Sequence, residues 1–184
     1  MDTGYWVFGY GSLMWRPGFA YAERRRATLR GYRRAFALSS LRYRGTPKSP
    51  GLVLGLDWAP GACCEGIAFR IAPSEEDAVR DYLHEREMVT RSYIELCCPV
   101  DLHPDGAAAE GIAVDATAYV LDRTHRQYAG GLSLERQAAI IAASVGPAGP
   151  NPDYLHNTVA HLREIGVEDP DLFALDAMVR ARTG

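Results

Sequence analysis

The chain has 184 residues, of which 47% are hydrophobic and 23% charged, and its formal net charge is −3. This composition excludes a fibrous or disordered protein, and the length suffices for one compact domain over residues 1–184 without metal or disulfide support. No apolar run approaches the ~20 residues that cross a bilayer, and the N-terminal residues lack the pattern of a secretory signal. We therefore expect a soluble, cytoplasmic protein that does not contact a membrane.

Basic residues concentrate in the first part of the chain. Residues 1–50 hold ten basic and two acidic side chains, whereas residues 51–184 hold ten basic and 21 acidic ones. The arginines between Arg24 and Arg34 raise the question of nucleic-acid binding. Because the whole chain is acidic and no nucleic-acid motif occurs, we expect a solvated or ion-paired strand face and no nucleic-acid partner. A field that attracts a small anionic substrate is a third interpretation.

Strand patterns dominate the first two thirds of the chain. Tyr5–Phe8 is aromatic and β-branched and runs into a glycine loop. A loop is expected over Ser39–Gly51, and a hairpin turn over Asp57–Gly61. The other predicted strands are Ala27–Leu38, Leu52–Leu56, Cys64–Ile71, Tyr93–Val100 and Ile112–Leu121.

Helical patterns begin near Ser74, where Asp77 three residues later is typical of a capping box. This first helix extends to about Met88. Asn151 is a good N-cap residue, since Pro152 can occupy the first helical position. The later predicted helices are Leu134–Val145, Pro152–Ile165 and Asp171–Arg182. Strands followed by helices indicate an α+β fold with a largely antiparallel sheet.

The loop Gly9-Tyr10-Gly11-Ser12-Leu13 is the first candidate site. Two glycines around a tyrosine allow backbone N–H groups to converge on a carboxylate or carbonyl oxygen. The third glycine of a dinucleotide fingerprint is absent, and so is a Walker loop. A simple tight turn after a strand remains the alternative.

Acidic residues at the end of the first helix form the second candidate site. Glu85 and Glu87 lie where the helix dipole disfavours an anion, which raises a carboxyl pKa toward the range of a general base. Glu87 shares a helix face with Leu83, and Glu85 lies nearer the solvent. The alternative is a hydrated helix end with Glu87 paired to Arg86 or Arg91.

The cysteines occur as two adjacent pairs, Cys63-Cys64 and Cys97-Cys98. Neighbours in a strand point to opposite faces, and the CxxC spacing of structural zinc sites is missing. We therefore expect buried, inert thiols and no metal.

Several motifs, taken together in chain order, resemble the ChaC family of γ-glutamylcyclotransferases over almost the whole chain. They are Val7-Phe8-Gly9-Tyr10-Gly11-Ser12-Leu13-Met14-Trp15, Arg44-Gly45-Thr46-Pro47, Pro50-Gly51-Leu52-Val53, Gly66-Ile67-Ala68-Phe69-Arg70, Tyr82-Leu83, Arg86-Glu87-Met88 and Gly146-Pro147-Ala148-Gly149-Pro150-Asn151 with Tyr154-Leu155. The link Met88–Ser92 departs from relatives that have a glycine pair there and is similar to the bacterial branch.

The resemblance implies a single-domain α+β fold with a small, mostly antiparallel, barrel-like sheet and flanking helices. It implies cleavage of glutathione to 5-oxoproline and Cys-Gly without a metal or other cofactor and without a protein partner. Glu87 would be the general acid/base. The substrate-binding residues would be Tyr10, Gly11, Ser12, Leu13, Arg44 and Tyr154. Two alternatives stay open: action on other γ-glutamyl amino acids or amines, and non-catalytic regulation of cation transport.

Overall fold

The computed structural model describes residues 4–88, 91–104 and 111–184. Two compact units make up the chain. The first contains the described residues of Met1–Arg34 and Leu56–Asp122, and the second contains Ala35–Gly55 and Arg123–Gly184. The single domain expected over residues 1–184 stays a prediction.

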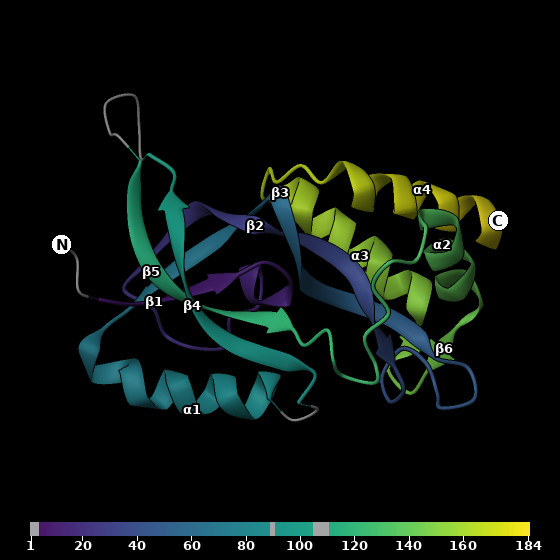
Figure 1. The fold of residues 1–184 in the computed structure, drawn as a ribbon, viewed down its shortest axis with the longest axis horizontal. Helices are drawn as coiled ribbons and strands as arrows, with labels where there is room; N and C mark the ends of the chain where they lie inside the picture. Colours follow the sequence, from purple (N-terminus) through teal and green to yellow (C-terminus); the bar gives the residue numbers. More distant parts are fainter. Residues whose placement is uncertain (1–3, 89–90, 105–110) are drawn as a thin grey trace. The chain divides into compact units, whose positions relative to one another are not determined.

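A closed five-stranded barrel is the central feature of the fold (Figure 1). Its strand order is β1-β3-β2-β4-β5, and the parallel pairing of β1 with β5 closes it. The pairs β1–β3, β2–β4 and β4–β5 are antiparallel, so the predicted α+β fold with a mostly antiparallel, barrel-like sheet is confirmed. The strands are β1 (Tyr5–Gly9), β2 (Glu23–Ser40), β3 (Gly51–Ile71), β4 (Tyr93–Leu102) and β5 (Ile112–Leu121).

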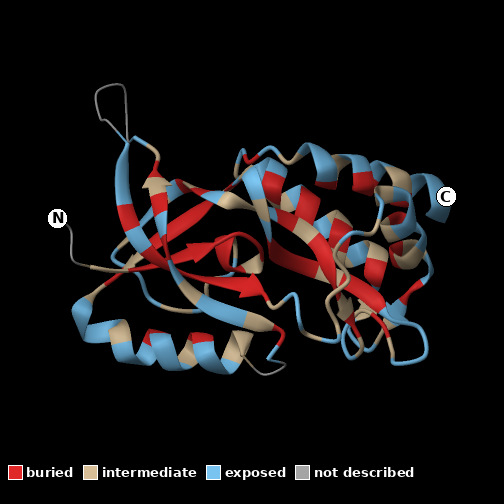
Figure 2. Cartoon of the chain, in the orientation of Figure 1, coloured by how far each residue is buried: buried red, intermediate tan, exposed pale blue. Residues whose placement is uncertain are grey.

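In the first unit, β1 is covered on both faces. Trp6, Val7 and Phe8 follow one another and are all buried, which requires neighbours on either side of the strand. Helix α1 (Glu76–Glu87) turns Val79 and Leu83 inward. Figure 2 shows buried positions along β1 and on one side of α1.

The second unit contains three helices, α2 (Leu134–Ala143), α3 (Asn151–Glu164) and α4 (Pro170–Thr183), besides parts of β2 and β3. Between α2 and α3 lies a small antiparallel pair, β6 (Val145–Gly146) and β7 (Gly149–Pro150), which the sequence patterns did not predict. In α3, the residues Leu155, Val159 and Leu162 are fully buried, at the spacing of one helix face. No helix among the described residues has the length and apolar character needed to span a bilayer.

The hairpin turn predicted over Asp57–Gly61 is wrong, because β3 continues through it. Asp57 is buried, and its carboxylate lies 3.6 Å from the Arg33 guanidinium of β2. Gly61 has a φ of +82°, a conformation that glycine supplies without strain, so the chain bends there without reversing. The Pro-Gly pair marks a local distortion of a long strand.

The capping box predicted at Ser74 is also wrong. Ser74 lies within a short 3₁₀ turn, η2 (Pro73–Glu75), that precedes α1. The N-cap of α1 is Glu75, which makes no side-chain capping bond. A 3₁₀ turn ahead of the helix shifts its start by two residues.

Asn151 is not the N-cap of α3, which is Pro150. Instead, the fully buried Asn151 side chain bonds the first part of β3 from within α3. The Leu52 N–H donates to Asn151 Oδ1 at 2.7 Å, and Asn151 Nδ2 donates to the Leu52 carbonyl at 2.8 Å. One amide therefore satisfies both backbone groups of a buried strand residue.

Replacing Asn151 with alanine should lower the free energy of unfolding by about 2 to 4 kcal/mol, because it leaves a buried N–H and a buried carbonyl unpaired. Urea denaturation measures the loss. The matched control is Asn157→Ala in the same helix, at an exposed position. Equal small losses in both variants would contradict the assigned role of Asn151.

Candidate active site

The loop after β1 folds into a tight turn. Met14 N donates to the Gly11 carbonyl at 2.9 Å, which forms the 3₁₀ turn η1 (Ser12–Met14). The N–H groups of Ser12 and Leu13 have no acceptor within this turn, as at the start of any helix. A Cβ atom on Gly9 would lie 3.0 Å from the Cβ of Leu13, so the close return of the chain favours glycine there.

Tyr10 holds this loop to the barrel. Tyr10 is buried, and its backbone carbonyl accepts a hydrogen bond from Nε of the buried Arg34 on β2. The loop is therefore anchored by the same strand that carries the arginine-rich segment.

Arg86, in the last turn of α1, connects the helix to this loop. Its Nη2 donates to Ser12 Oγ at 2.9 Å, and its Nη1 donates to the Arg16 carbonyl at 3.0 Å. Nη1 also lies 2.7 Å from the Tyr82 hydroxyl, one turn earlier in α1. These contacts place the end of α1 directly beside the turn after β1.

Glu87, the last residue of α1, has a largely buried side chain with 18% of its surface exposed. Its Oε1 lies 3.3 Å from Arg86 Nε. Burial raises the pKa of Glu87 above its ordinary value, and the positive charge of Arg86 opposes that rise. Glu85 is exposed, as the helical spacing predicts. A carboxyl with a raised pKa beside a polar turn accepts a proton more readily than an ordinary glutamate, as a general base requires.

Arg44 and Tyr154 come together in the second unit. The Arg44 guanidinium lies 5.5 Å from the centroid of the Tyr154 ring, and its Nη1 donates to the Pro150 carbonyl at 3.2 Å. The Tyr154 ring also packs edge-on against Phe36 of β2, with centroids 5.6 Å apart. The structure thus groups Tyr10, Gly11, Ser12, Leu13 and Glu87 in one unit, and Arg44 with Tyr154 in the other. All these assigned roles stay predictions.

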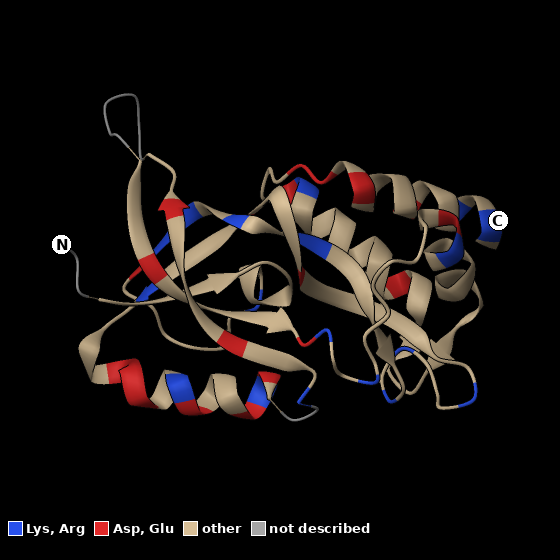
Figure 3. Cartoon of the chain, viewed as in Figure 1, with Lys and Arg blue, Asp and Glu red and all other residues tan. Residues whose placement is uncertain are grey.

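Acidic and basic residues alternate along α1 (Figure 3). On β2, Arg26 lies 2.6 Å from Glu65, and Arg30 lies 2.8 Å from Asp101. Together with Arg33 beside Asp57, these pairs match the expected ion-paired strand face.

Each cysteine pair splits between the two faces of its strand. Cys64 and Cys98 are buried, whereas Cys63 and Cys97 are exposed. The expectation of buried thiols is wrong for the exposed pair, because adjacent strand residues cannot both face inward. In the part of the chain that the structure describes, no three histidine, cysteine or acidic side chains are placed to hold a metal ion.

Two features of the site escaped the sequence patterns. Arg86 stood in the Arg86-Glu87-Met88 motif and as a possible ion-pair partner of Glu87, but its bonds to residues some 70 positions earlier have no local signal. Tyr119 of β5 donates its hydroxyl proton to Glu95 Oε2 at 2.9 Å. The two residues stand opposite each other in the β4–β5 register, which alternation alone does not fix.

Comparisons with known proteins show the family of the chain. Residues 5–182 match the family model described as ChaC-like protein. The glutathione-specific γ-glutamylcyclotransferase of Escherichia coli is 35% identical over 167 residues, which cover 91% of this chain and 69% of that protein. Gamma-glutamylcyclotransferase 2-3 of Arabidopsis thaliana is 35% identical over 178 residues, which cover 95% of this chain and 88% of that protein.

A solved structure has the same fold. It is the crystal structure of a γ-glutamyl cyclotransferase specific to glutathione from yeast, with a TM-score of 0.84 and 25% sequence identity. The match covers 99% of this chain and 100% of the yeast chain.

Glu87→Gln should stabilise the protein at a pH of about 7.5, because the raised pKa means that burial disfavours the Glu87 carboxylate. The wild type recovers stability as the pH falls through the folded-state pKa of Glu87. The difference should therefore vanish below the ordinary value of 4.5. Urea denaturation at a series of pH values measures both variants.

The exposed Glu85 provides the matched control, and Glu85→Gln should show no such dependence. A Glu87→Gln protein less stable than the wild type at neutral pH would show that the ion pair with Arg86 outweighs burial.

Proposed function

The chain belongs to the ChaC-like protein family, and we propose that it is a γ-glutamylcyclotransferase that acts on glutathione. One observation carries the proposal: Arg86 donates to Ser12 Oγ and lies 3.3 Å from the largely buried Glu87 carboxylate, so one guanidinium contacts both the turn and the acid. The names of the relatives from Escherichia coli and yeast support glutathione as the substrate.

In the proposed reaction the substrate supplies its own nucleophile. The α-amino nitrogen of the γ-glutamyl group attacks the γ-carbonyl carbon, a five-membered lactam forms, and the amide bond to the cysteine nitrogen breaks. The products are 5-oxoproline and Cys-Gly. Because both reacting groups belong to the substrate, the protein lowers the barrier by holding the substrate in the cyclising conformation, so that less conformational freedom is lost when the ring closes. The protein then has to bind, orient and move protons.

Glu87 would perform the proton transfers. Its carboxylate takes a proton from the substrate ammonium, which frees the nitrogen lone pair for attack, and then gives a proton to the departing amide nitrogen. A raised pKa suits both steps, because the carboxylate is a stronger base and its protonated form appears at a higher pH than in an ordinary glutamate. The adjacent guanidinium of Arg86 keeps the unprotonated form accessible.

The loop Tyr10-Gly11-Ser12-Leu13 would hold the γ-glutamyl group. The N–H groups of Ser12 and Leu13 at the start of the 3₁₀ turn can donate to the substrate carboxylate or to the developing oxyanion. We further propose that Arg44 and Tyr154 contact the substrate, since the resemblance assigns them and a guanidinium stacked on a ring is held in place for an anion.

No metal, nucleotide or protein partner enters this proposal. The ion pairs of the arginines on β2 support the absence of a nucleic-acid partner. We also propose a cytoplasmic location, where thiols stay reduced, because all four cysteines are free.

The decisive test is turnover of glutathione, followed by the release of 5-oxoproline. We expect activity in the wild type and a loss of about 10²- to 10⁴-fold in kcat in Glu87→Gln, which keeps the shape of the side chain but cannot carry the proton. A panel of γ-glutamyl amino acids and amines, assayed in parallel, measures the strictness for glutathione.

Glu85→Gln is the matched control, because it removes an exposed acid two positions earlier in the same helix. It should retain wild-type turnover. A folded Glu87→Gln variant with full activity would remove Glu87 from the mechanism, and an inactive wild type on every γ-glutamyl substrate would refute the proposed function.

A further inference from the structure

Tyr82 of α1 stands in the motif Tyr82-Leu83, and the proposed mechanism gives it no role. Its side chain contacts residues 15–22, which join the 3₁₀ turn η1 to β2 and are called the connecting segment below. Tyr82 thus lies between the helix that ends in Glu87 and the chain that leaves the Ser12 turn. Its contacts on both sides show what the side chain does there.

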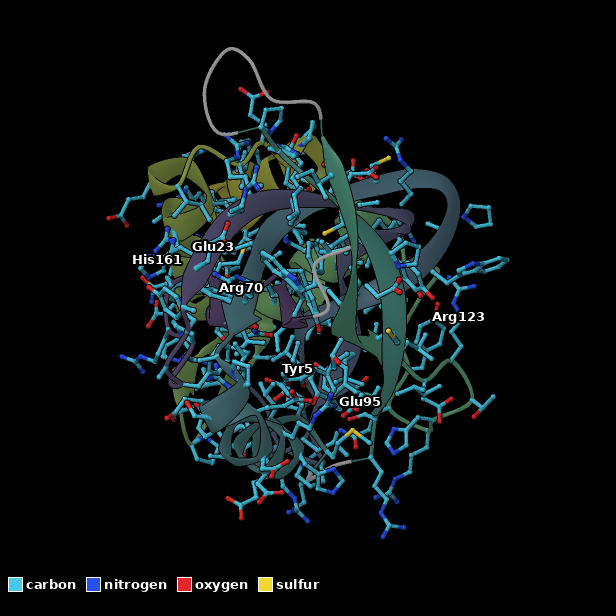
Figure 4. The ribbon with its side chains drawn as sticks, turned by 90° about the vertical axis from the view of Figure 1, so that its left-hand side faces the viewer. Tyr5, Glu23, Arg70, Glu95, Arg123 and His161 are labelled. Carbon is cyan, nitrogen blue, oxygen red and sulfur yellow. The ribbon has the colours of Figure 1, made fainter. Side chains whose placement is uncertain are left out.

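The connecting segment is anchored at both ends. At its start, the Arg16 N–H donates to the Ser12 carbonyl at 2.7 Å, and at its end the Ala22 N–H donates to the Arg70 carbonyl of β3 at 2.8 Å. The Arg70 side chain also pairs at 2.9 Å with Glu23, the first residue of β2. Figure 4 labels Arg70 and Glu23, which lie side by side. The path of the connecting segment between η1 and β2 is therefore fixed.

The middle of the connecting segment holds the Tyr82 ring. The ring packs edge-on against Phe19, with centroids 6.2 Å apart, and Phe19 packs edge-on against Phe69 of β3 at 5.6 Å. Gly18 has a φ of +77°, and a Cβ atom there would collide with the Tyr82 hydroxyl oxygen. The hydroxyl thus occupies the space that a larger residue at position 18 would fill, and the direction of the Tyr82 side chain is set by these neighbours.

The Tyr82 hydroxyl in turn holds Arg86, one helical turn later. Arg86 Nη1 donates to the Tyr82 oxygen at 2.7 Å, closer than to the carbonyls of Arg16 at 3.0 Å and Pro17 at 3.2 Å. An arginine side chain has many rotamers, so each bond that fixes it in advance lowers the entropy lost when the site is assembled. Unlike the two carbonyls, the Tyr82 oxygen belongs to the same helix as Arg86, and it therefore orients the guanidinium relative to α1.

The direction of Nη1 determines that of Nη2, because the guanidinium is planar and rigid. Nη2 donates to Ser12 Oγ at 2.9 Å, in the turn proposed to hold the γ-glutamyl group. We propose that Tyr82 is a positioning residue for substrate binding: its hydroxyl orients Arg86 so that Arg86 holds the Ser12 turn in the shape that accepts the γ-glutamyl group. This inference rests on the proposed function and on the proposed role of the turn.

The test is the kinetics of glutathione turnover by Tyr82→Phe. Phenylalanine keeps the ring beside Phe19 and removes only the oxygen that accepts from Arg86 Nη1. We expect KM to rise about 10-fold, the size of one hydrogen bond to a charged group, and kcat to change less than about 3-fold, since Glu87 itself is intact. Partial unfolding would give the opposite pattern, because a smaller active fraction lowers kcat and leaves KM unchanged.

Tyr21→Phe is the matched control. Tyr21 packs against Phe69 in the same aromatic cluster, with centroids 5.1 Å apart, and its side chain is exposed. The same loss of a hydroxyl there should leave KM and kcat at their wild-type values.

A double variant tests the route through Ser12. In Ser12→Ala the acceptor of Arg86 Nη2 is already lost, so adding Tyr82→Phe should raise KM by less than about 2-fold beyond Ser12→Ala alone. A Tyr82 side chain that acts by packing alone would change KM by the same factor with and without Ser12→Ala.

An unchanged KM in Tyr82→Phe, or an equal rise of KM in both backgrounds, overturns the inference. Either result leaves the proposed function intact as long as the wild type turns over glutathione. A wild type that is inactive on every γ-glutamyl substrate refutes the function itself, and the inference with it.

Discussion

The guanidinium of Arg86 is the interaction on which the candidate site depends. The guanidinium is planar and has five N–H donors. It donates to Ser12 Oγ and to two loop carbonyls, and its Nε lies beside the Glu87 carboxylate. The loop and the helix end are about 70 residues apart in the chain. Without a side chain that donates in several directions at once, the turn after β1 and the carboxylate of Glu87 would belong to two unrelated segments.

The ion pair between Arg86 and Glu87 also limits how far the pKa of Glu87 rises. Burial beside the barrel favours neutral Glu87, and the positive charge one residue away favours the carboxylate. A general base needs both influences: a pKa high enough to accept a proton, and an ionised fraction large enough to start the reaction. Thus Arg86 has two effects, since it positions the loop and moderates the pKa of Glu87.

Hydrophobic spacing and residue type predicted those features of the fold that depend on neighbouring residues in the sequence. The buried strand Tyr5–Phe8, the first helix, and the inward turn of Glu87 relative to Glu85 all follow from spacing and residue type. The errors arose where a distant partner overrides a local signal. The turn at Asp57 gives way to a continuous strand in which Asp57 pairs with Arg33, and Asn151 bonds Leu52 in place of capping its helix.

The motif residues that carry the family resemblance show why some features were predictable from local patterns and others were not. Ser12, Arg86, Arg44 and Asn151 are polar, and each bonds a group far away in sequence, in three of the four cases a backbone group. Such contacts leave no periodicity, because their geometry requires a particular side chain at one position. The motifs therefore carried information that the alternation of apolar and polar residues could not. They contain the residues whose side chains make hydrogen bonds between distant segments of the chain. Tyr119 and Glu95 are joined by a hydrogen bond between β4 and β5, yet neither residue stands in those motifs, so only the structure shows that pair.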